Sequence, residues 1–451
     1  MSAVDQAFCE THPGAIELIP LATVDLQRWR IENPDLWTGF HARPGQVHHM
    51  RHKGGECVLF GICPDDRWAL GDAPRLLPQA DYRLTATGSA IDLTEAALAW
   101  SAGRYRFGRY KTADAASGPR LCWPEGVDRQ NVKREAEART LVRNLINTPA
   151  NDMGPAELAD AASTVAKHGN ARIEICCGDD LLGKNFPLVH AVGRASSRPP
   201  CLIDIRWGEH GAPKVRLVGK GVCFDSGGLN LKAADPMLLM KKDMAGAAHV
   251  LGLAQMIMDA KLRVDLRVLI PAVENAVSGS AMRPLDVIRS RRGLTVEIGN
   301  TDAEGRLILA DALAAACEDD PDLVIDFATL TSAARIALGP EVPALFSNDE
   351  TVASSFLAAS AATNDPMWRM PLWRRYATNL NGAVADLASV APGPMAGSIH
   401  AALFLDRFVS APWAHLDIYA WNPKHQPGRP EGGDAHGLRA AYAVIEQLAR
   451  R

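Results

Sequence analysis

Residues 294–313, LTVEIGNTDAEGRLILADAL, decide how this chain is interpreted. The apolar residues alternate at first, which predicts a strand, and from Leu307 they recur at helical spacing. The carboxylates of Asp302 and Glu304 and the guanidinium of Arg306 therefore lie where a strand gives way to a helix. Open α/β folds bind their ligands at such turns. The simpler alternative is an acidic first helical turn, which any helix favours.

The composition is ordinary for a globular protein, and the length is that of an enzyme. The chain has 451 residues, of which 47% are hydrophobic and 22% charged, and its net charge is −4. This length allows two or three domains, and the mild acidity gives no general attraction to nucleic acid or anionic membranes. No apolar run approaches the roughly 20 residues of a membrane span, and the N-terminus does not resemble a secretory signal. We therefore expect a cytoplasmic protein.

The cysteines support the same expectation. There are nine, an odd number, and none forms a C-x-x-C pair. This pattern predicts reduced, mostly buried thiols rather than a disulfide framework.

The first two parts of the chain differ in their patterns. Residues 1–125 mix strand-like runs, at 57–62 and 104–107, with a helical run at 91–100, which predicts a small N-terminal α/β domain. Residues 126–150 are highly charged at first and then apolar, and a turn rich in Pro and Asn follows. This pattern predicts one long linker helix.

In the third part, residues 151–451, apolar strand-like runs alternate with helical runs. This alternation predicts a larger catalytic α/β domain with a mixed, largely parallel sheet covered by helices. Helices are expected at 244–259 and 305–317. The main strand candidates are 201–205, 215–219, 265–270, 323–328 and 414–418.

A group of histidines lies in the N-terminal part, at His41, His48, His49 and His52. The i, i+4 spacing of His48 and His52 allows a metal site. No Cys or carboxylate completes a ligand set nearby, so a solvated basic loop is the favoured interpretation.

Carboxylates and cations gather just after the predicted strands of the third part. Four carboxylates in one pocket would repel one another unless cations neutralise them. Two divalent ions about 3.5–4 Å apart are the usual solution, and they stabilise both the attacking and the polarised oxygen of a hydrolysis. The candidates are Asp225, Asp243, Asp302 and Glu304, with Lys220, Lys232 and Arg306.

Other catalytic signatures are missing. The sequence contains no H-E-x-x-H motif, G-x-S-x-G motif or P-loop. Ser226, in Asp-Ser-Gly-Gly, is a formal candidate nucleophile, but no His lies near it in sequence, so a turn is favoured. Taken singly, Lys220 could be a surface residue and Asp243 a helix cap. Their joint placement at strand ends favours the metal site.

Three runs, in this order, resemble those of the leucyl aminopeptidases, the M17 metallopeptidases. The similarity extends from Asn147 to about residue 420, and the N-T-D-A-E-G-R run is its most specific part. The first 125 residues carry no comparable motif. The runs are VGKGVCFDSGG at 218–228, MKKDMAGAA at 240–248 and NTDAEGRL at 300–307.

The resemblance implies a metalloaminopeptidase that releases the N-terminal residue of short peptides with a water activated by two metal ions. Mn or Zn would serve most readily, and Co or Mg could also serve. One ion would be held by Lys220, Asp225, Asp243 and Glu304, and the other, exchangeable ion by Asp225, Asp302 and Glu304. Relatives of this kind are usually homohexamers whose active sites face an internal cavity.

The resemblance also implies the catalytic groups. Lys232 would polarise the scissile carbonyl, and Arg306 would bind a bicarbonate that acts as general base. Backbone N–H groups near Gly305 and Leu330 would help to hold this anion.

The substrate pocket departs from the family pattern. Met240, Thr329 and Leu330 match it, but Ser332 stands where Gly is usual and His400 where Thr is usual. Because Ser narrows and polarises a pocket, we expect weaker use of large N-terminal side chains.

Three alternatives remain at this stage. The first is a dipeptidase of the same chemistry but narrower specificity, for example one that acts on Cys-Gly. The second is a DNA-binding accessory protein, which the acidic net charge disfavours and a gel-shift at physiological salt would test. The third is a structural hexamer with an incidental metal site.

Overall fold

The computed structural model describes residues 4–34, 39–52, 54–85, 91–111 and 118–450. The chain forms two compact units, and the division falls inside one long helix, α4 (Arg129–Asn147). The smaller unit comprises Met1–Thr140 and a late segment, Asn422–Gly432. The larger comprises Leu141–Trp421 and Gly433–Arg451. The polypeptide therefore leaves the larger unit near its end and returns to it.

Among its described residues, the smaller unit contains a six-stranded sheet in the order β1-β6-β5-β2-β4-β3. Only the pair of β3 and β4 is antiparallel. The predicted small α/β fold is confirmed. Its strands are β1 (Phe8–Cys9), β2 (Ile16–Ala22), β3 (Val47–His52), β4 (Gly55–Ile62), β5 (Asp81–Leu84) and β6 (Arg120–Cys122). Its helices are η1 (Asp5–Ala7), α1 (Thr23–Glu32), η2 (Ala69–Asp72), α2 (Ala73–Leu76) and α3 (Leu93–Arg104).

The strand predicted at 104–107 is wrong. Arg104 is the last residue of α3, and no strand follows it before the described range ends at residue 111. The side chain of Arg106 donates hydrogen bonds to the carbonyl oxygens of Gly103 and Tyr105, at 3.0 and 2.8 Å. It thus satisfies carbonyl groups at the end of the helix.

Three of the four histidines lie on a strand, so the loop prediction is wrong for them and holds only for His41. His48, His49 and His52 belong to β3, which pairs with β4. Residues four apart on a strand are separated by roughly 13 Å. One ion cannot join His48 to His52 over that distance, so the metal alternative fails as well.

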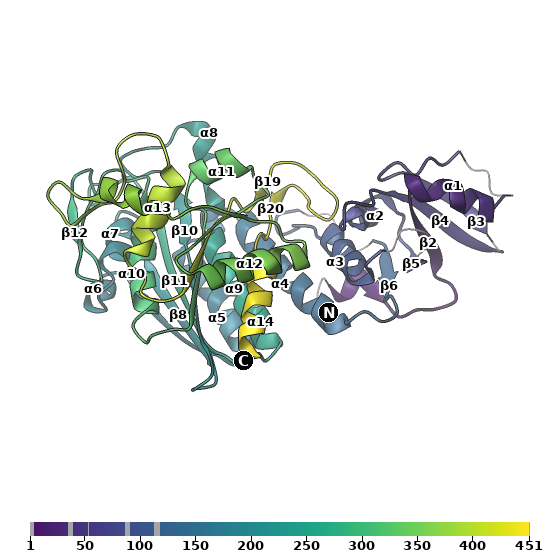
Figure 1. The fold of residues 1–451 in the computed structure, drawn as a ribbon, viewed down its shortest axis with the longest axis horizontal. Helices are drawn as coiled ribbons and strands as arrows, with labels where there is room; N and C mark the ends of the chain where they lie inside the picture. The colour runs from purple at the N-terminus through teal and green to yellow at the C-terminus, as the bar shows by residue number, and fades with distance from the viewer. Residues whose placement is uncertain (1–3, 35–38, 53, 86–90, 112–117, 451) are drawn as a thin grey trace. The chain divides into compact units, whose positions relative to one another are not determined.

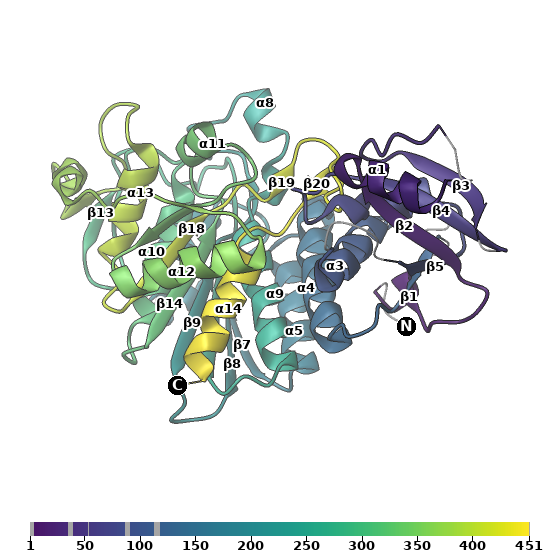
Figure 2. The ribbon, with the colours of Figure 1, turned by 45° about the vertical axis from the view of Figure 1, so that its right-hand side comes forward.

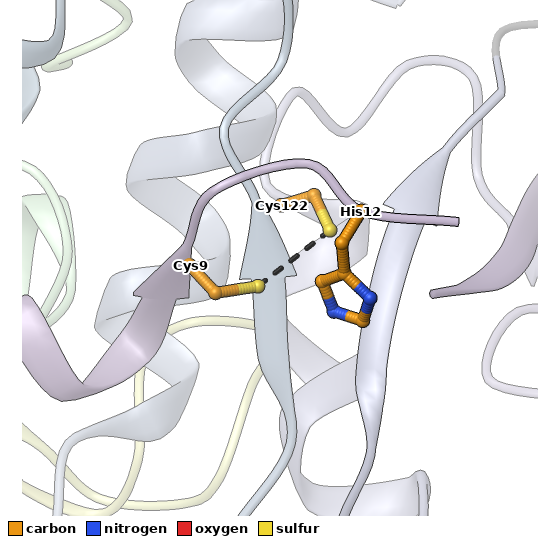
Figure 3. Close-up of side chains that lie close together, drawn as sticks. All are labelled: Cys9, His12 and Cys122. Carbon is orange, nitrogen blue, oxygen red and sulfur yellow. Dashed lines mark hydrogen bonds between the residues drawn. The ribbon is translucent and has the colours of Figure 1, made fainter. Parts of the chain in front are cut away.

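The sulfur atoms of Cys9 on β1 and Cys122 on β6 contact each other without a covalent bond (Figure 3). Cys9 and Cys122 are register partners, and their Sγ atoms are 3.5 Å apart. His12 lies beside them, with Nε2 2.9 Å from a carboxylate oxygen of Asp81. Burial, followed by the neighbouring thiol, raises the pKa of Cys9 to about 12. The two cysteine side chains act here as small apolar groups at the sheet edge.

The larger unit is built on a nine-stranded mixed sheet within its described residues. The order is β16-β15-β18-β14-β9-β11-β8-β7, with β10 pairing with β11. The central pairs are parallel, so the prediction of a mixed, largely parallel sheet is confirmed. The strands are β7 (Arg172–Cys177), β8 (Cys201–Gly208), β9 (Lys214–Gly219), β10 (Gly221–Asp225), β11 (Asp265–Asn275), β14 (Leu323–Ala328), β15 (Ala344–Ser347), β16 (Trp368–Arg369) and β18 (Trp413–Asp417).

Helices cover both faces of this sheet (Figures 1 and 2). One face carries α5 (Pro155–His168), α9 (Ala245–Asp259), α12 (Glu350–Thr363) and α14 (Leu438–Ala449). The other carries α7 (Pro187–Gly193), α10 (Glu304–Ala316) and α13 (Gly397–Asp406). Because both faces are covered, the central strands are almost continuously apolar and buried.

Shorter elements complete the chain. A small sheet joins β12 (Val287–Arg289), β13 (Thr295–Glu297) and β17 (Leu387–Ala388). The late segment of the smaller unit begins at β19 (Trp421–Asn422) and ends at β20 (Gly432–Gly433). The remaining helices are η3 (Ala150–Asp152), α6 (Asp180–Gly183), α8 (Ala234–Met237), η4 (Met240–Lys242), α11 (Ser332–Leu338) and η5 (Arg374–Leu380). In the described chain, we find no helix with the length and apolar character of a membrane span.

The prediction that all cysteines are reduced is wrong for one pair. Cys177 on β7 and Cys201 on β8 form a disulfide. The antiparallel register places the two residues opposite each other, with their Cα atoms 4.1 Å apart. Their spacing in the sequence carries no sign of this pairing. The other seven cysteines are free thiols.

Candidate active site

The polar residues gather at the carboxyl edge of the central strands. β9, β10, β11 and β14 run parallel, so their ends meet at one edge of the sheet. A cavity of about 1010 Å³ lies there. Every site residue predicted from the sequence lines this cavity, namely Lys220, Asp225, Lys232, Met240, Asp243, Asp302, Glu304, Arg306, Thr329, Leu330 and Ser332.

A glycine lets the next helix approach this edge. Gly246 lies in the first turn of α9, and a Cβ atom there would lie 2.0 Å from the carbonyl oxygen of Phe327 on β14. The N–H of Ala247 donates to the carbonyl of Lys220. Only Gly allows this backbone contact, which holds Asp243, just before the helix, against Lys220.

The Asp-Ser-Gly-Gly segment forms a turn that orients Asp225. The N–H of Gly227 donates to Asp225 Oδ1 at 2.9 Å. Ser226 donates its hydroxyl to the carbonyl of Asn275 at 2.7 Å. The hydroxyl of Ser226 is therefore committed to the turn, as favoured from the sequence.

Thr301 connects this turn to the start of α10. Its hydroxyl donates to the carbonyl of Gly227 at 2.6 Å, and its N–H donates to Asn230 Oδ1 at 2.8 Å. Asp302, directly after Thr301, and Glu304, which begins α10, are thus brought next to Asp225.

Three carboxylates converge in the cavity. Asp225, Asp302 and Glu304 each offer an oxygen atom, and these atoms all lie within 4.8 Å of one another. Glu304 Oε2 is buried and accepts no hydrogen bond from the residues that the structure describes. A buried carboxylate oxygen normally has a partner, so this geometry fits the binding of cations.

Two lysines balance part of this charge. Lys220 Nζ lies 2.8 Å from Asp243 Oδ2 and 3.0 Å from Glu304 Oε1. Lys232 Nζ lies 2.8 Å from Asp225 Oδ2 and 2.5 Å from Asp302 Oδ1.

These contacts set the protonation of the buried groups. Burial lowers the pKa of Lys220, but the charges of Asp243 and Glu304 outweigh burial and raise it above its ordinary value. Burial raises the pKa of Asp243 to about 7. In the arrangement seen here, Lys220 is therefore an ammonium group.

The guanidinium of Arg306 has one donor that no described residue accepts. Its Nη1 donates to the carbonyl of Ser389 at 2.8 Å, whereas its buried Nε has no acceptor among the described residues. Burial lowers its pKa to about 10, so the side chain stays charged at neutral pH. The N–H of Leu330, which the resemblance assigns to bicarbonate, instead donates to Asp417 Oδ1 at 3.0 Å.

The substrate pocket combines apolar and polar walls. The hydroxyl of Thr329 donates to Asp243 Oδ1 at 2.7 Å, so it positions that carboxylate. Ser332 is exposed at the first position of α11. His400 lies 3.2 Å from the side-chain nitrogen of Asn379. Burial, followed by the charge of Arg306, lowers its pKa, so His400 contributes a neutral ring.

Sequence reasoning missed several residues of the site. Asn275 donates its amide to Asp225 Oδ1 at 2.8 Å and to the carbonyl of Thr301 at 3.0 Å. It ends β11, whereas the predicted strand stopped at Ile270. A longer strand would have placed Asn275 at the same edge as Asp225. Lys242 and Tyr419 also line the cavity and were missed.

The chain matches two family profiles in sequence. Residues 140–442 match the catalytic domain of the cytosol aminopeptidase family. Residues 11–124 match the N-terminal domain of the M17 aminopeptidases. A probable cytosol aminopeptidase of Syntrophotalea carbinolica is 38% identical over 413 residues, 85% of this chain and 83% of that protein. One from Rhodococcus jostii is 38% identical over 80% of this chain and 76% of its own length.

Solved structures agree. The cytosol aminopeptidase of Coxiella burnetii superposes with a TM-score of 0.93 and 47% identity, covering 98% of this chain and 99% of that one. The bottromycin maturation enzyme BotP, in complex with Mn, has a TM-score of 0.86 and 33% identity, covering 97% of this chain and all of its own. From these matches, together with the carboxylate cluster, we conclude that the chain belongs to the cytosol aminopeptidase family and is a metal-dependent aminopeptidase.

Proposed function

We propose that this aminopeptidase holds two divalent ions and releases the N-terminal residue of short peptides. The observation that carries the proposal is the convergence of Asp225, Asp302 and Glu304, with a buried Glu304 oxygen that has no described partner. Carboxylate oxygens are ligands that Mn and Zn both accept. The donor set therefore fits divalent ions.

The ligands divide into two overlapping groups. Asp225 and Glu304 would belong to both groups. Asp302 completes one group, and Lys220 with Asp243 completes the other. Lys220 Nζ lies within 3.0 Å of carboxylate oxygens of both Asp243 and Glu304; it would join this group as a neutral amine, after losing the proton that it carries in the arrangement seen here.

When bound, the two ions acidify a water molecule, bind the free α-amine of the substrate and stabilise charge on the scissile carbonyl. The protein supplies the remaining groups. Lys232 donates a hydrogen bond to the carbonyl oxygen and to the negative charge that develops there. Asn275 and Thr329 keep Asp225 and Asp243 in place.

Arg306 is proposed to hold a bicarbonate ion, which serves as the base. Its buried Nε is available because it has no acceptor among the described residues. The N–H of Leu330 is engaged with Asp417, so the support for this anion comes from Arg306 and the backbone near Gly305.

We extend the proposal to metals, specificity and assembly. BotP, which is 33% identical, was solved with Mn, so Mn is the first ion to test, with Zn, Co and Mg as alternatives. The activity is of the leucyl aminopeptidase type, with large N-terminal side chains disfavoured by Ser332. The assembly is a homohexamer in the cytoplasm, and its mass in solution would test this part.

Hydrolysis of leucine amide by metal-stripped protein tests the proposal. Added Mn should restore release of leucine in the wild type. Glu304→Ala should lose at least about a hundredfold in kcat/KM, since even changes behind the ligands cost 10- to 100-fold. The control is Glu446→Ala on the surface of α14. Turnover without metal, or an unaffected Glu304→Ala variant, would contradict the proposal.

A further inference from the structure

Two cations in the cavity wall are not used by the proposed chemistry. Lys242 ends η4, and Arg335 lies in α11. Both line the cavity, and so does Tyr419. Lys242 Nζ lies 4.5 Å from the centroid of the Tyr419 ring, and Arg335 Cζ lies 4.9 Å from the same centroid. One aromatic ring therefore positions two positive charges through cation–π contacts.

Neither cation forms an ion pair with a carboxylate of the described residues. Within the part of the chain that the structure describes, no carboxylate oxygen lies within 4.0 Å of a side-chain nitrogen of Lys242 or Arg335, which is the distance that defines an ion pair. Lys220 and Lys232, in the same cavity, each contact two carboxylates within 3.0 Å. The unpaired cations thus form a distinct part of the wall.

The burial of Lys242 makes this arrangement informative. Lys242 is only 4% exposed, and its ammonium group makes no hydrogen bond to a described residue, only the contact with Tyr419. Burial is costly for a charge without an ion pair, and the attraction of the more distant carboxylates of Asp243 and Asp417 does not outweigh it. An anion that binds in the cavity between or beside the two like charges would reduce the repulsion between them.

The proposed role of the cavity indicates which anion these two cations bind. It holds the peptide in the proposed reaction, and the anionic group that peptides carry is the carboxylate. Guanidinium groups bind carboxylates with two parallel hydrogen bonds, and an ammonium group adds a point charge. We infer that Lys242 and Arg335, positioned on Tyr419, form a subsite that binds a carboxylate of the peptide substrate.

This subsite deepens the proposed function and rests on it. The carboxylate has two sources, the C-terminus of a dipeptide and an acidic side chain. In the first case, the enzyme selects dipeptides with a free C-terminal carboxylate over their amides. In the second, it selects peptides with Glu or Asp.

Two substrate pairs separate these sources. Leu-Gly and Leu-Gly-amide differ only in the C-terminal carboxylate, and Leu-Glu-amide and Leu-Gln-amide differ only in the side-chain carboxylate. The full-length protein with Mn is assayed as wild type and as Arg335→Met, and the kcat/KM ratio is taken within each pair. Arg263→Met is the control, because Arg263 is a solvent-exposed residue paired with Glu209.

In one pair, the wild type should have a higher kcat/KM for the substrate with the carboxylate than for its uncharged partner. This ratio should fall about 10- to 100-fold in Arg335→Met, because that is the usual worth of a charged hydrogen bond. Arg335→Lys should retain part of the preference, and Arg263→Met all of it. Turnover with the same ratios in wild type and Arg335→Met would overturn the subsite alone. A wild type inactive on all four substrates would overturn the proposed function together with the subsite.

Discussion

Substitution of Gly305 by Ala probes the packing of the site with one added methyl group. Gly305 lies in the first turn of α10, between Glu304 and Arg306. A Cβ atom there would lie 2.5 Å from Lys220 Cε and 2.7 Å from Nζ. Carbon atoms in contact are normally about 3.5–4.0 Å apart. The Lys220 side chain must therefore retreat by roughly 1 Å.

The substitution should reduce activity more than it reduces the stability of the fold, because Lys220 is one of the proposed metal ligands. Lys220 Nζ now lies 2.8 Å from Asp243 and 3.0 Å from Glu304, and the retreat lengthens both contacts. Losing a hydrogen bond to a charged group costs about 1.5–3 kcal/mol, which corresponds to roughly a 10- to 150-fold loss of rate. Overpacking adds about 1–3 kcal/mol, while Ala favours a helix over Gly by about 1 kcal/mol, so the free energy of unfolding changes less than activity.

The assay is kcat/KM for leucine amide at several Mn concentrations, together with thermal unfolding of the metal-free protein. Gly183→Ala is the matched control, because Gly183 is also helical and a Cβ atom there meets nothing within 4 Å. A Gly305→Ala variant with wild-type kcat/KM and Mn affinity would refute the reasoning, because Lys220 would then have no role that depends on its position.

Three further predictions follow. Ser332→Gly should raise kcat/KM for N-terminal Leu and Phe relative to Ala about tenfold, because it widens the pocket; a panel on which the wild type already prefers Leu and Phe would contradict this. Burial lowers the pKa of His415 but Asp326, 2.6 Å away, raises it more. The stabilisation by this pair is therefore complete below the unfolded-state pKa of about 6.5 and is lost as pH rises through the higher folded pKa. The free energies of unfolding of the wild type and of His415→Asn should therefore converge between pH 6 and pH 9. A difference that stays constant over this range would contradict the pairing. The denatured protein should titrate seven thiols, and nine after reduction of Cys177–Cys201; nine thiols without reductant would contradict the disulfide.

Local patterns predicted the catalytic unit well. The five strands and two helices expected from the sequence correspond to β8, β9, β11, β14, β18, α9 and α10. These elements are buried on both faces or strongly periodic, so their signal is local. The expected site residues all line one cavity because parallel strands end at one edge.

Features that depend on distant residues could not be predicted. The contact of Arg335 with Tyr419 joins α11 to the segment that follows β18, and the Cys177–Cys201 disulfide depends on strand register. The smaller unit gave the weakest prediction. Its strand β4 was expected, at 57–62, but β3, which carries three histidines, lacks the apolar alternation that marks a strand.

Counting metal ions tests the central claim most directly. Metal-free wild type, Asp302→Ala and Asp243→Ala would each be dialysed against increasing Mn, and bound ions and leucine release measured on the same samples. The account predicts that the wild type binds two ions per chain and becomes active as the second binds, while each variant binds only one tightly and remains nearly inactive. Full activity of the wild type with one bound ion, or two tightly bound ions in either variant, would contradict it.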